Sequence, residues 1–310
     1  MNTPAARDFK QVDVFSATPY YGNPLAVVLD GSGLSDEAMQ RFAHWTQLSE
    51  TTFVLPPTQP GADYRVRIFT PQAELPFAGH PTLGTCHAWL QAGGRSQQRD
   101  VIVQECAVGL VTIRRSGTQL AFAAPPLKRS TPAPSLLARV AQALGIQVAQ
   151  IRAAQVLDNG PQWLGLLLDH SDTVLALEPN HALLKELNQK VGVCAVDTAP
   201  SALQLIARSS REARAFANHA GAAPHAAQTD LEVRAFAAPV GITEDPVTGS
   251  LNASLAQWLM VEGHMPSRYV ASQGVCLGRA GRVWLERDAQ GQVWVGGQAV
   301  TCIDGQVVLA

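Results

Sequence analysis

The sequence predicts an α+β protein made of two similar halves, and three observations lead to this prediction. At 310 residues, the chain is long for a single compact core, so two domains are the natural expectation. Segments that alternate as strands do are interspersed along the chain with segments of helical periodicity. In addition, two distant loops match: residues 77–85, FAGHPTLGT, and residues 244–250, EDPVTGS.

The two loops match best when they are aligned on their prolines. The stretch HPTLGT at 80–85 then corresponds to DPVTGS at 245–250. An apolar stretch of helical character follows each loop, with Trp89 after the first and Trp258 after the second. We therefore expect two similar domains that face each other, each directing one helix N-terminus towards a shared cleft.

The first half is predicted to contain two helices and seven strands. Ser35 is a suitable N-cap for the first helix, and Asp36 and Glu37 fall in its first turn, where the helix dipole favours anions. The second helix is expected at about 82–92, after the first loop. The strands are expected near residues 12–15, 26–29, 51–55, 65–69, 100–105, 108–114 and 119–123.

The stretch 124–134 contains four prolines and is the best candidate for a linker. It places the predicted domains at 1–127 and 128–310. Beyond it, Ser135 is expected to cap a helix that ends at Gly145, and Pro179 to open another. A longer helix is expected after the second loop. Strands are expected at 163–168, 202–207, 231–236, 283–287 and 293–295, with turns at 289–292 and 304–305.

Composition and charge favour a cytoplasmic protein. The net charge of -2 and the lack of a dense Lys/Arg run argue against a nucleic-acid partner. The polar first ten residues lack the apolar core of a signal peptide, and no apolar run reaches the ~18 residues needed to cross a membrane. An odd, dispersed set of cysteines is typical of reduced thiols. They are Cys86, Cys106, Cys194, Cys276 and Cys302.

Both loops have features of an anion-binding site. A helix N-terminus presents backbone N–H groups without intrahelical partners, and glycine lets a ligand approach them closely. Gly79-His80 and Gly249-Ser250 could therefore hold a substrate carboxylate between two helix ends. Ordinary helix caps are the alternative interpretation. The presence of His80 and Asp245 at matching places favours a functional site.

Glu50 is a second candidate, at a helix-to-strand junction next to apolar residues 53–55. Apolar surroundings favour the neutral form of a carboxyl group and raise its pKa towards the range useful for proton transfer. On the pattern alone, a solvated glutamate in a connecting loop is the simpler interpretation.

Motifs for metals and common cofactors are missing. His80 and His87 are seven residues apart, without the spacing or the carboxylates of a metal site. Neither a G-x-G-x-x-G nor a G-x-x-x-x-G-K-[ST] motif supports nucleotide binding. A hydrolase built from Ser250, His80 and Asp245 would lack the G-x-S-x-G elbow. We therefore expect neither a metal nor a cofactor.

The motifs along the chain, in their order, resemble those of the PhzF-like phenazine biosynthesis isomerase family. The similarity extends over nearly the whole chain and is weakest at about 210–230. The stretches that carry it are VDVF at 12–15, GNPLAVV at 22–28, LSETTFV at 48–54, FTP at 69–71, ELPFAGHP at 74–81, RAF at 234–236, EDPVTGS at 244–250, ASQG at 271–274 and LGR at 277–279.

The resemblance implies a diaminopimelate-epimerase-like fold, in which two domains related by a pseudo-two-fold axis each wrap a curved mixed sheet around a central helix. The C-terminal strand of that fold can return to the first domain. The resemblance also implies a cofactor-independent enzyme and a homodimer.

By the same resemblance, Glu50 would be the acid/base that removes and returns a proton. His80, Asp245 and Ser250 would be its catalytic partners. Backbone groups at Gly79 and Gly249 would bind the carboxylate of a small-molecule substrate.

Epimerases and racemases of this fold use a pair of cysteines in the two matching loops, and neither loop here contains one. We therefore expect an isomerase that moves a proton by acid/base chemistry in the interdomain cleft. Two alternatives stay open: an epimerase or racemase of the same fold, and a non-catalytic protein that binds small acids.

Overall fold

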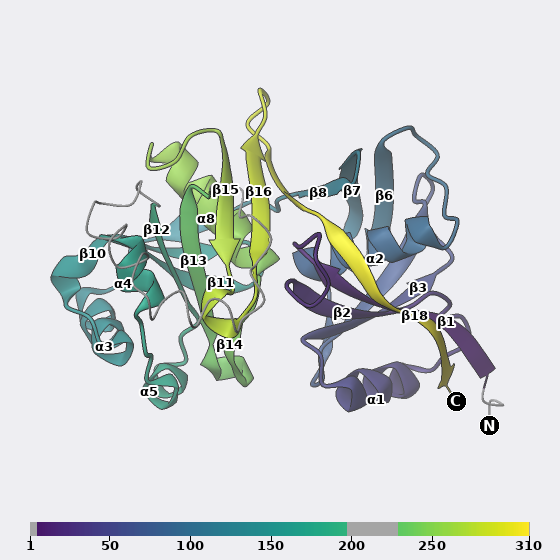
Figure 1. Cartoon of the computed structure of the whole chain (residues 1–310), viewed down its shortest axis with the longest axis horizontal. Helices are drawn as coiled ribbons and strands as arrows, with labels where there is room; N and C mark the ends of the chain where they lie inside the picture. The colour runs from purple at the N-terminus through teal and green to yellow at the C-terminus, as the bar shows by residue number, and fades with distance from the viewer. Residues whose placement is uncertain (1–4, 197–228, 310) are drawn as a thin grey trace, which may run out of the picture.

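A computed structural model describes residues 5–196 and 229–309 of the chain. These residues form two halves that lie side by side, one running from purple to blue and the other from teal to green (Figure 1). The strand expected at 202–207 lies outside the described residues, as do His219 and His225, for which the sequence predicts a surface loop.

The first half contains a peripheral helix and a central helix, α1 (Asp36–Thr46) and α2 (Gly79–Gln91). Its strands are β1 (Ala5–Val14), β2 (Asn23–Val28), β3 (Glu50–Leu55), β4 (Tyr64–Phe69), β5 (Glu74–Leu75), β6 (Val101–Cys106), β7 (Gly109–Ser116) and β8 (Gln119–Ala123).

In the second half, the described helices are α3 (Pro134–Leu144), α4 (Ser171–Leu175), α5 (His181–Glu186) and α8 (Gly249–Val261). Short 3-10 turns lie at Val148–Gln150, Ala238–Val240 and Val275–Leu277. The strands of this part of the chain are β9 (Lys128–Ser130), β10 (Ile151–Asp158), β11 (Gln162–Leu168), β12 (Val191–Val196), β13 (Leu231–Ala237), β14 (Ile242–Asp245), β15 (Arg268–Gln273), β16 (Gly281–Arg287), β17 (Val293–Gly297) and β18 (Ala299–Leu309).

The two halves repeat one order of strand pairing. It runs β18-β1-β2-β3-β4-β6-β7-β8 in the first half and β9-β10-β11-β12-β13-β15-β16-β17 in the second. In both, the third and fourth strands are parallel, as are the fifth and sixth, and the other pairs are antiparallel. This repetition confirms the predicted fold class of two similar α+β units.

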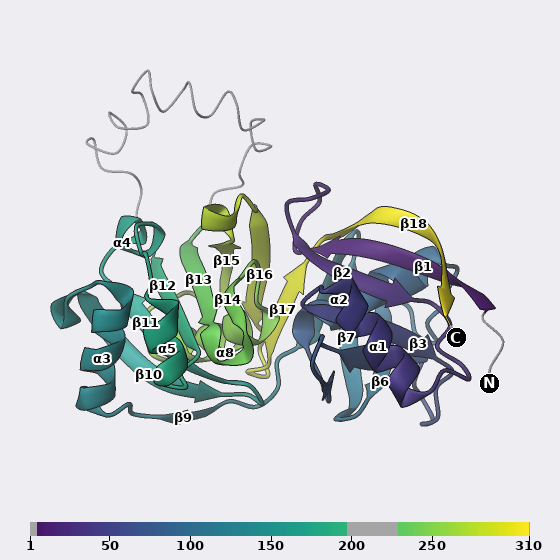
Figure 2. The ribbon, with the colours of Figure 1, turned by 90° about the horizontal axis from the view of Figure 1, so that it is seen from below.

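β8 and β17 hold the same place in the two halves and pair antiparallel with each other. Figure 2 shows β17 between the two halves. Because equivalent strands pair with opposite directions, a pseudo-two-fold axis passes between them.

The helices α2 and α8 form the centres of the two halves. In both, nearly every residue of the first three turns is buried, and α8 buries Trp258 completely. A helix with so few exposed residues must be covered by other elements on nearly all sides. Accordingly, α2 contacts β1, β2, β3, β6 and β8, whereas α8 contacts β10, β16 and β17.

Helix starts were predicted with mixed success. The Ser35 hydroxyl caps α1 as expected. The cap expected at Ser135 is wrong, because α3 already begins at Pro134, whose fixed φ suits the first helical position. The start expected at Pro179 is also wrong, since the side chain of Asn180 caps α5.

The turn expected at Asp304-Gly305 is wrong as well. Both residues lie within β18, which runs antiparallel to β1, with Lys10 opposite Asp304. The Lys10 ammonium lies 2.6 Å from the Asp304 carboxylate, so an ion pair joins β1 and β18. In Figure 1, β18 accordingly crosses to the first half. The division of the domains between residues 127 and 128 stays a prediction.

Candidate functional site

The first turns of α2 and α8 meet where the two halves adjoin. A Cβ atom on Gly249 would lie 3.1 Å from the backbone nitrogen of His80 and 3.3 Å from the Cα of Gly79. A Cβ atom on Gly79 would collide with the ring of Phe122. Close packing therefore requires glycine at position 79 and leaves little room for a Cβ atom at position 249. Binding of a substrate by Gly79 and Gly249 stays a prediction.

When the two loops are aligned on the first residues of their helices, different residues correspond than in the alignment on the prolines. Gly79 and Gly249 each begin a helix, so His80 corresponds to Ser250. Asp245 instead ends β14, four residues before α8. The matching places assigned to His80 and Asp245 are therefore wrong. The two side chains approach the site from different kinds of element.

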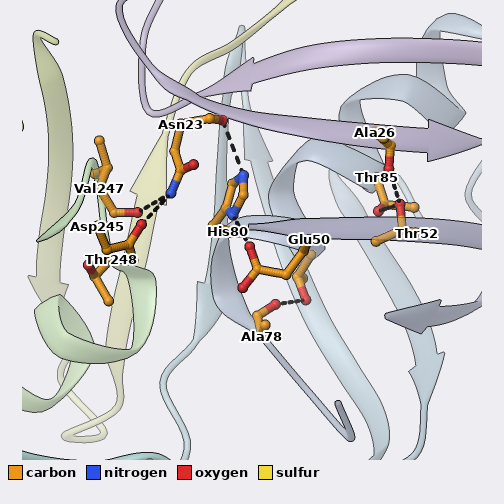
Figure 3. Close-up of polar contacts among 11 residues, drawn as sticks. Asn23, Ala26, Glu50, Thr52, Ala78, His80, Thr85, Asp245, Val247 and Thr248 are labelled. Carbon is orange, nitrogen blue, oxygen red and sulfur yellow. Dashed lines mark hydrogen bonds and ion pairs between the residues drawn. The ribbon is translucent and has the colours of Figure 1, made fainter. Parts of the chain in front are cut away.

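Glu50 and His80 form a hydrogen-bonded pair, which Figure 3 shows. Glu50 is the first residue of β3, and its Oε2 lies 3.0 Å from Nδ1 of the buried His80. Nε2 of His80 lies 3.1 Å from the backbone oxygen of Asn23. A carbonyl oxygen only accepts, so Nε2 must carry a hydrogen. The contact at Nδ1 then needs one further proton, which Glu50 and His80 share.

Asn23 connects this pair to the second half. Its backbone oxygen accepts from His80, and its side-chain amide donates to Oδ1 of Asp245 at 3.0 Å and to the backbone oxygen of Val247 at 2.9 Å. In Figure 3, Asn23 accordingly lies between His80 and Asp245. The sequence indicated only a turn here. The partner of Asn23 is 222 positions away, and no local pattern indicates such a contact.

Asp245 is half-buried, and both of its carboxylate oxygens accept hydrogen bonds. Oδ1 accepts from Asn23, and Oδ2 accepts from the Thr248 hydroxyl at 2.7 Å. Burial raises the pKa of Asp245 from its ordinary value of 3.8 to about 6, and the negative charge of Glu50 acts in the same direction. The two hydrogen bonds and the charge of His80 oppose this rise of the pKa. Asp245 therefore changes protonation near neutral pH.

Ser250 is held by two residues of the second half. Its hydroxyl oxygen accepts from Nε1 of Trp163 at 3.2 Å, and its backbone oxygen accepts from the side chain of Asn159 at 3.0 Å. An indole N–H only donates, so the Ser250 hydroxyl keeps its hydrogen for a different acceptor. Among the described residues, no hydrogen bond joins Ser250 to Glu50, His80 or Asp245.

Glu244, although adjacent to Asp245, belongs to a separate contact. Its carboxylate accepts two hydrogen bonds from Arg234, at 3.0 and 2.9 Å, and both side chains are more than nine-tenths buried. Arg234 also donates to the backbone oxygens of Val174 and Leu177 at the end of α4. We therefore assign Glu244 to the framework of the fold.

Three further observations concern the described structure beyond these residues. A hollow of about 480 Å³ lies on the outer side of the first half, lined by Phe42, Trp45 and Ile303 among others, and includes none of the predicted site residues. In the described ranges, no cluster of three or more His, Cys, Asp or Glu side chains is arranged to hold a metal ion. None of the helices there combines the length and hydropathy needed to cross a bilayer.

Comparisons with known proteins identify the family. The PhzC-PhzF family model, described as phenazine biosynthesis-like protein, matches residues 12–305. Antisense-enhancing sequence 1 of Schizosaccharomyces pombe is 34% identical to this chain, over 96% of this chain and 97% of its own length. Trans-2,3-dihydro-3-hydroxyanthranilate isomerase of Pseudomonas aeruginosa is 31% identical, over 96% and 98%.

Solved structures show the same fold. A PhzF-family phenazine biosynthesis protein of Bacillus anthracis superposes with a TM-score of 0.78 at 22% identity, covering 98% of this chain and 99% of the other. A hydroxyproline epimerase of Agrobacterium vitis gives a TM-score of 0.56 at 15% identity, covering 98% and 92%. Together, the family model and the relatives confirm the predicted family: the chain belongs to the PhzC-PhzF (phenazine biosynthesis-like) family and is a PhzF-type isomerase.

Proposed function

We propose that this protein moves a proton within a small carboxylate-bearing metabolite, without a cofactor, and that Glu50 is the acid/base. The observation that carries the proposal is the 3.0 Å contact between Oε2 of Glu50 and Nδ1 of His80. The Glu50 side chain is 18% exposed and the His80 side chain 5%. A ligand can therefore reach the carboxyl group, whereas the imidazole is held behind it.

In the proposed reaction, the Glu50 carboxylate removes a proton from a substrate carbon beside a conjugated group. The electron pair of the broken C–H bond enters the conjugated system, and the double bond shifts. Glu50 then returns the same proton to another carbon, so that atoms and charge balance. His80 keeps its Nδ1 hydrogen bond to Oε2 throughout, which orients the carboxyl and leaves Oε1 for the substrate.

The facing helix starts supply donors for the substrate carboxylate. The first backbone N–H groups of a helix lack intrahelical acceptors, and the helix dipole favours an anion there. We assign this role to the backbone around Gly79 and Gly249, with the Ser250 hydroxyl as a further donor. Asp245, with its pKa near neutrality, would assist proton transfer in the interdomain cleft.

Thiol chemistry fits the described residues less well. A two-thiol epimerase needs a reactive cysteine at each helix start, but the first cysteine after Gly79 is Cys86. Cys86 is buried, and burial raises the pKa of its thiol to about 12. A thiol held so firmly in its neutral form is a poor base.

Hydrogen exchange in D₂O tests the proposal. The acids to be tested are trans-2,3-dihydro-3-hydroxyanthranilate, which the name of one relative suggests, and a panel of small unsaturated carboxylic acids. We expect deuterium to enter the substrate carbon with the wild-type protein and the rate to fall at least ~100-fold in Glu50→Gln. The matched control is Glu286→Gln, at an exposed ion pair in the second half.

Undiminished exchange in Glu50→Gln would refute the role of Glu50. Inversion of a stereocentre together with inactivation by thiol alkylation would favour an epimerase. Binding of acids without exchange at any pH would favour the non-catalytic alternative. The homodimer and the cytoplasmic location stay predictions, and analytical ultracentrifugation tests the first of them.

A further inference from the structure

Gln273, the last residue of β15, has a fully buried side chain whose amide makes four hydrogen bonds. Its Oε1 accepts from the backbone nitrogen of Thr248 at 3.0 Å and from the side chain of Asn252 at 2.8 Å. Its Nε2 donates to the backbone oxygen of Asp245 and to the Thr248 hydroxyl, both at 3.0 Å. One amide thus binds both residues that lie on either side of the turn before α8.

Backbone groups alone fix the orientation of this amide. The backbone nitrogen of Thr248 can only donate, so it must face Oε1. The backbone oxygen of Asp245 can only accept, so it must face Nε2. Rotating the amide by 180° would place donor against donor and acceptor against acceptor in a buried site, which is costly. Gln273 therefore presents an N–H group to the Thr248 hydroxyl.

The orientation of Gln273 determines the direction of the next hydrogen bond. Since the Thr248 oxygen accepts from Gln273, its single hydrogen is directed to its other partner, Oδ2 of Asp245, at 2.7 Å. The hydrogen bonds thus run from Gln273 to Thr248 to Asp245. On the other side of the carboxylate, the Asn23 amide donates to Oδ1. Both oxygens of Asp245 consequently face donors.

We propose that Gln273 is a positioning residue for the site: it holds the Thr248 hydroxyl as a donor to Asp245 and thereby favours the carboxylate form of Asp245. The titratable groups that face Asp245 are Glu50 on β3, whose charge opposes ionisation, and His80 on α2, whose charge favours it. The hydrogen bond from Thr248 acts with His80.

The consequence for catalysis rests on the proposed function. A negative charge on Asp245 attracts the proton that Glu50 and His80 share and keeps it within the pair. When Asp245 takes up a proton at lower pH, this attraction is lost. The value of kcat/KM should therefore fall at the pH at which Asp245 becomes protonated. Gln273 should determine that pH through its effect on Asp245.

The test measures the titration of Asp245 directly, by ¹³C NMR of its side-chain carboxyl carbon in the substrate-free protein. The signal is assigned by its loss in Asp245→Asn. We expect Thr248→Val, which removes the hydroxyl and keeps the shape, to raise the midpoint by about one pH unit. Thr248→Ser keeps the hydroxyl and should leave the midpoint unchanged.

Gln273→Met should raise the midpoint by a similar amount, because the Thr248 hydroxyl is then no longer held towards Asp245. In the double variant with Thr248→Val, the midpoint should rise no further than in Thr248→Val alone, since the two residues act in series. Additive shifts, or an unchanged midpoint in Gln273→Met, would overturn the proposal. If Gln273→Met does not fold, an unchanged midpoint in Thr248→Val overturns it as well.

Because this NMR titration needs no substrate, it separates the two proposals. A midpoint that shifts as expected in a protein without isomerase activity would support the role of Gln273 and refute the proposed function. Where activity is found, the acidic limb of kcat/KM should move with the NMR midpoint. A limb that stays in place while the midpoint moves would overturn the catalytic consequence.

Discussion

Replacing Asp245 by Asn should stabilise the protein at alkaline pH and not at acidic pH. Burial and the charge of Glu50 raise the pKa of Asp245 from 3.8 to about 6. The folded protein thus holds this proton more tightly than the unfolded chain does. For an acid with a raised pKa, the stabilising contribution is complete below about pH 4 and is lost as the pH rises through about 6. Asparagine carries no proton to lose, so the variant avoids this loss.

The size of the effect follows from the two pKa values. The difference between 3.8 and about 6 corresponds to about 3 kcal/mol at ~1.4 kcal/mol per pH unit. Asp245 is only half-buried, so water screens part of this energy. We expect the unfolding free energy of Asp245→Asn, relative to the wild type, to increase by about 2 kcal/mol between pH 4 and pH 8. Any change in hydrogen bonding that is independent of pH cancels in this comparison.

Urea unfolding at pH 4, 6 and 8 measures the difference. The matched control is Asp169→Asn, at an exposed position where water screens the charge. The unfolding free energy of this control, relative to the wild type, should be the same at all three pH values. The reasoning would be refuted if the Asp245→Asn difference were level across this range or decreased with pH. If Asp245→Asn is more stable at pH 8 but less active, then Asp245 serves activity at a cost in stability.

Three further substitutions test other contacts. Gly249→Ala should lower the unfolding free energy by about 1–3 kcal/mol, because the new Cβ presses on the first turn of α2. In the control Gly305→Ala, where a Cβ meets nothing within 4 Å, the change should be less than ~0.5 kcal/mol. Equal melting temperatures of the two variants would contradict this expectation. Arg234→Met leaves the buried Glu244 without its partner and should lower the free energy of unfolding, measured with urea, by about 3–5 kcal/mol. Adding Glu244→Gln to this variant should restore part of the loss. A loss below ~1 kcal/mol in Arg234→Met would argue against a buried ion pair. Trp163→Phe removes the donor that holds Ser250 and should raise KM several-fold with little change in kcat, and an unchanged KM would argue against substrate binding by Ser250.

Local patterns predicted the strands of the first half better than those of the second. Of β9 to β18, only β11, β13, β16 and β17 were predicted. The strands and the central helices depend on the spacing of apolar residues, which is visible within short windows of the sequence. The second helix begins at Gly79, three residues before the predicted start, because Pro81 is tolerated within a first turn. Pro246, by contrast, lies outside α8. The proline that follows His80 thus lies inside a helix, whereas the proline that follows Asp245 lies before one. This is why the alignment on the prolines wrongly placed His80 and Asp245 at matching positions.

The candidate site was predicted in part. Glu50 and His80 were named from the sequence, and the structure places them 3.0 Å apart. Asn23 and Gln273 were not named as site residues, although their stretches contributed to the resemblance. Their functions arise from contacts with residues 222 and 25 positions away, respectively. Such contacts depend on tertiary packing, which propensities and periodicities do not encode.

The pairing of β1 with β18 bears on the order in which the protein folds. Lys10 and Asp304 are 294 positions apart, so the edge of the first half is completed only when β18 has been synthesised. The strands of the second half, β9 to β17, all lie within residues 128–297. We expect this half to complete its sheet first when the full chain refolds, because its strands pair over shorter sequence separations than β1 and β18 do. Hydrogen exchange during refolding should show protection of β10–β13 before β1, and the reverse order would contradict the expectation.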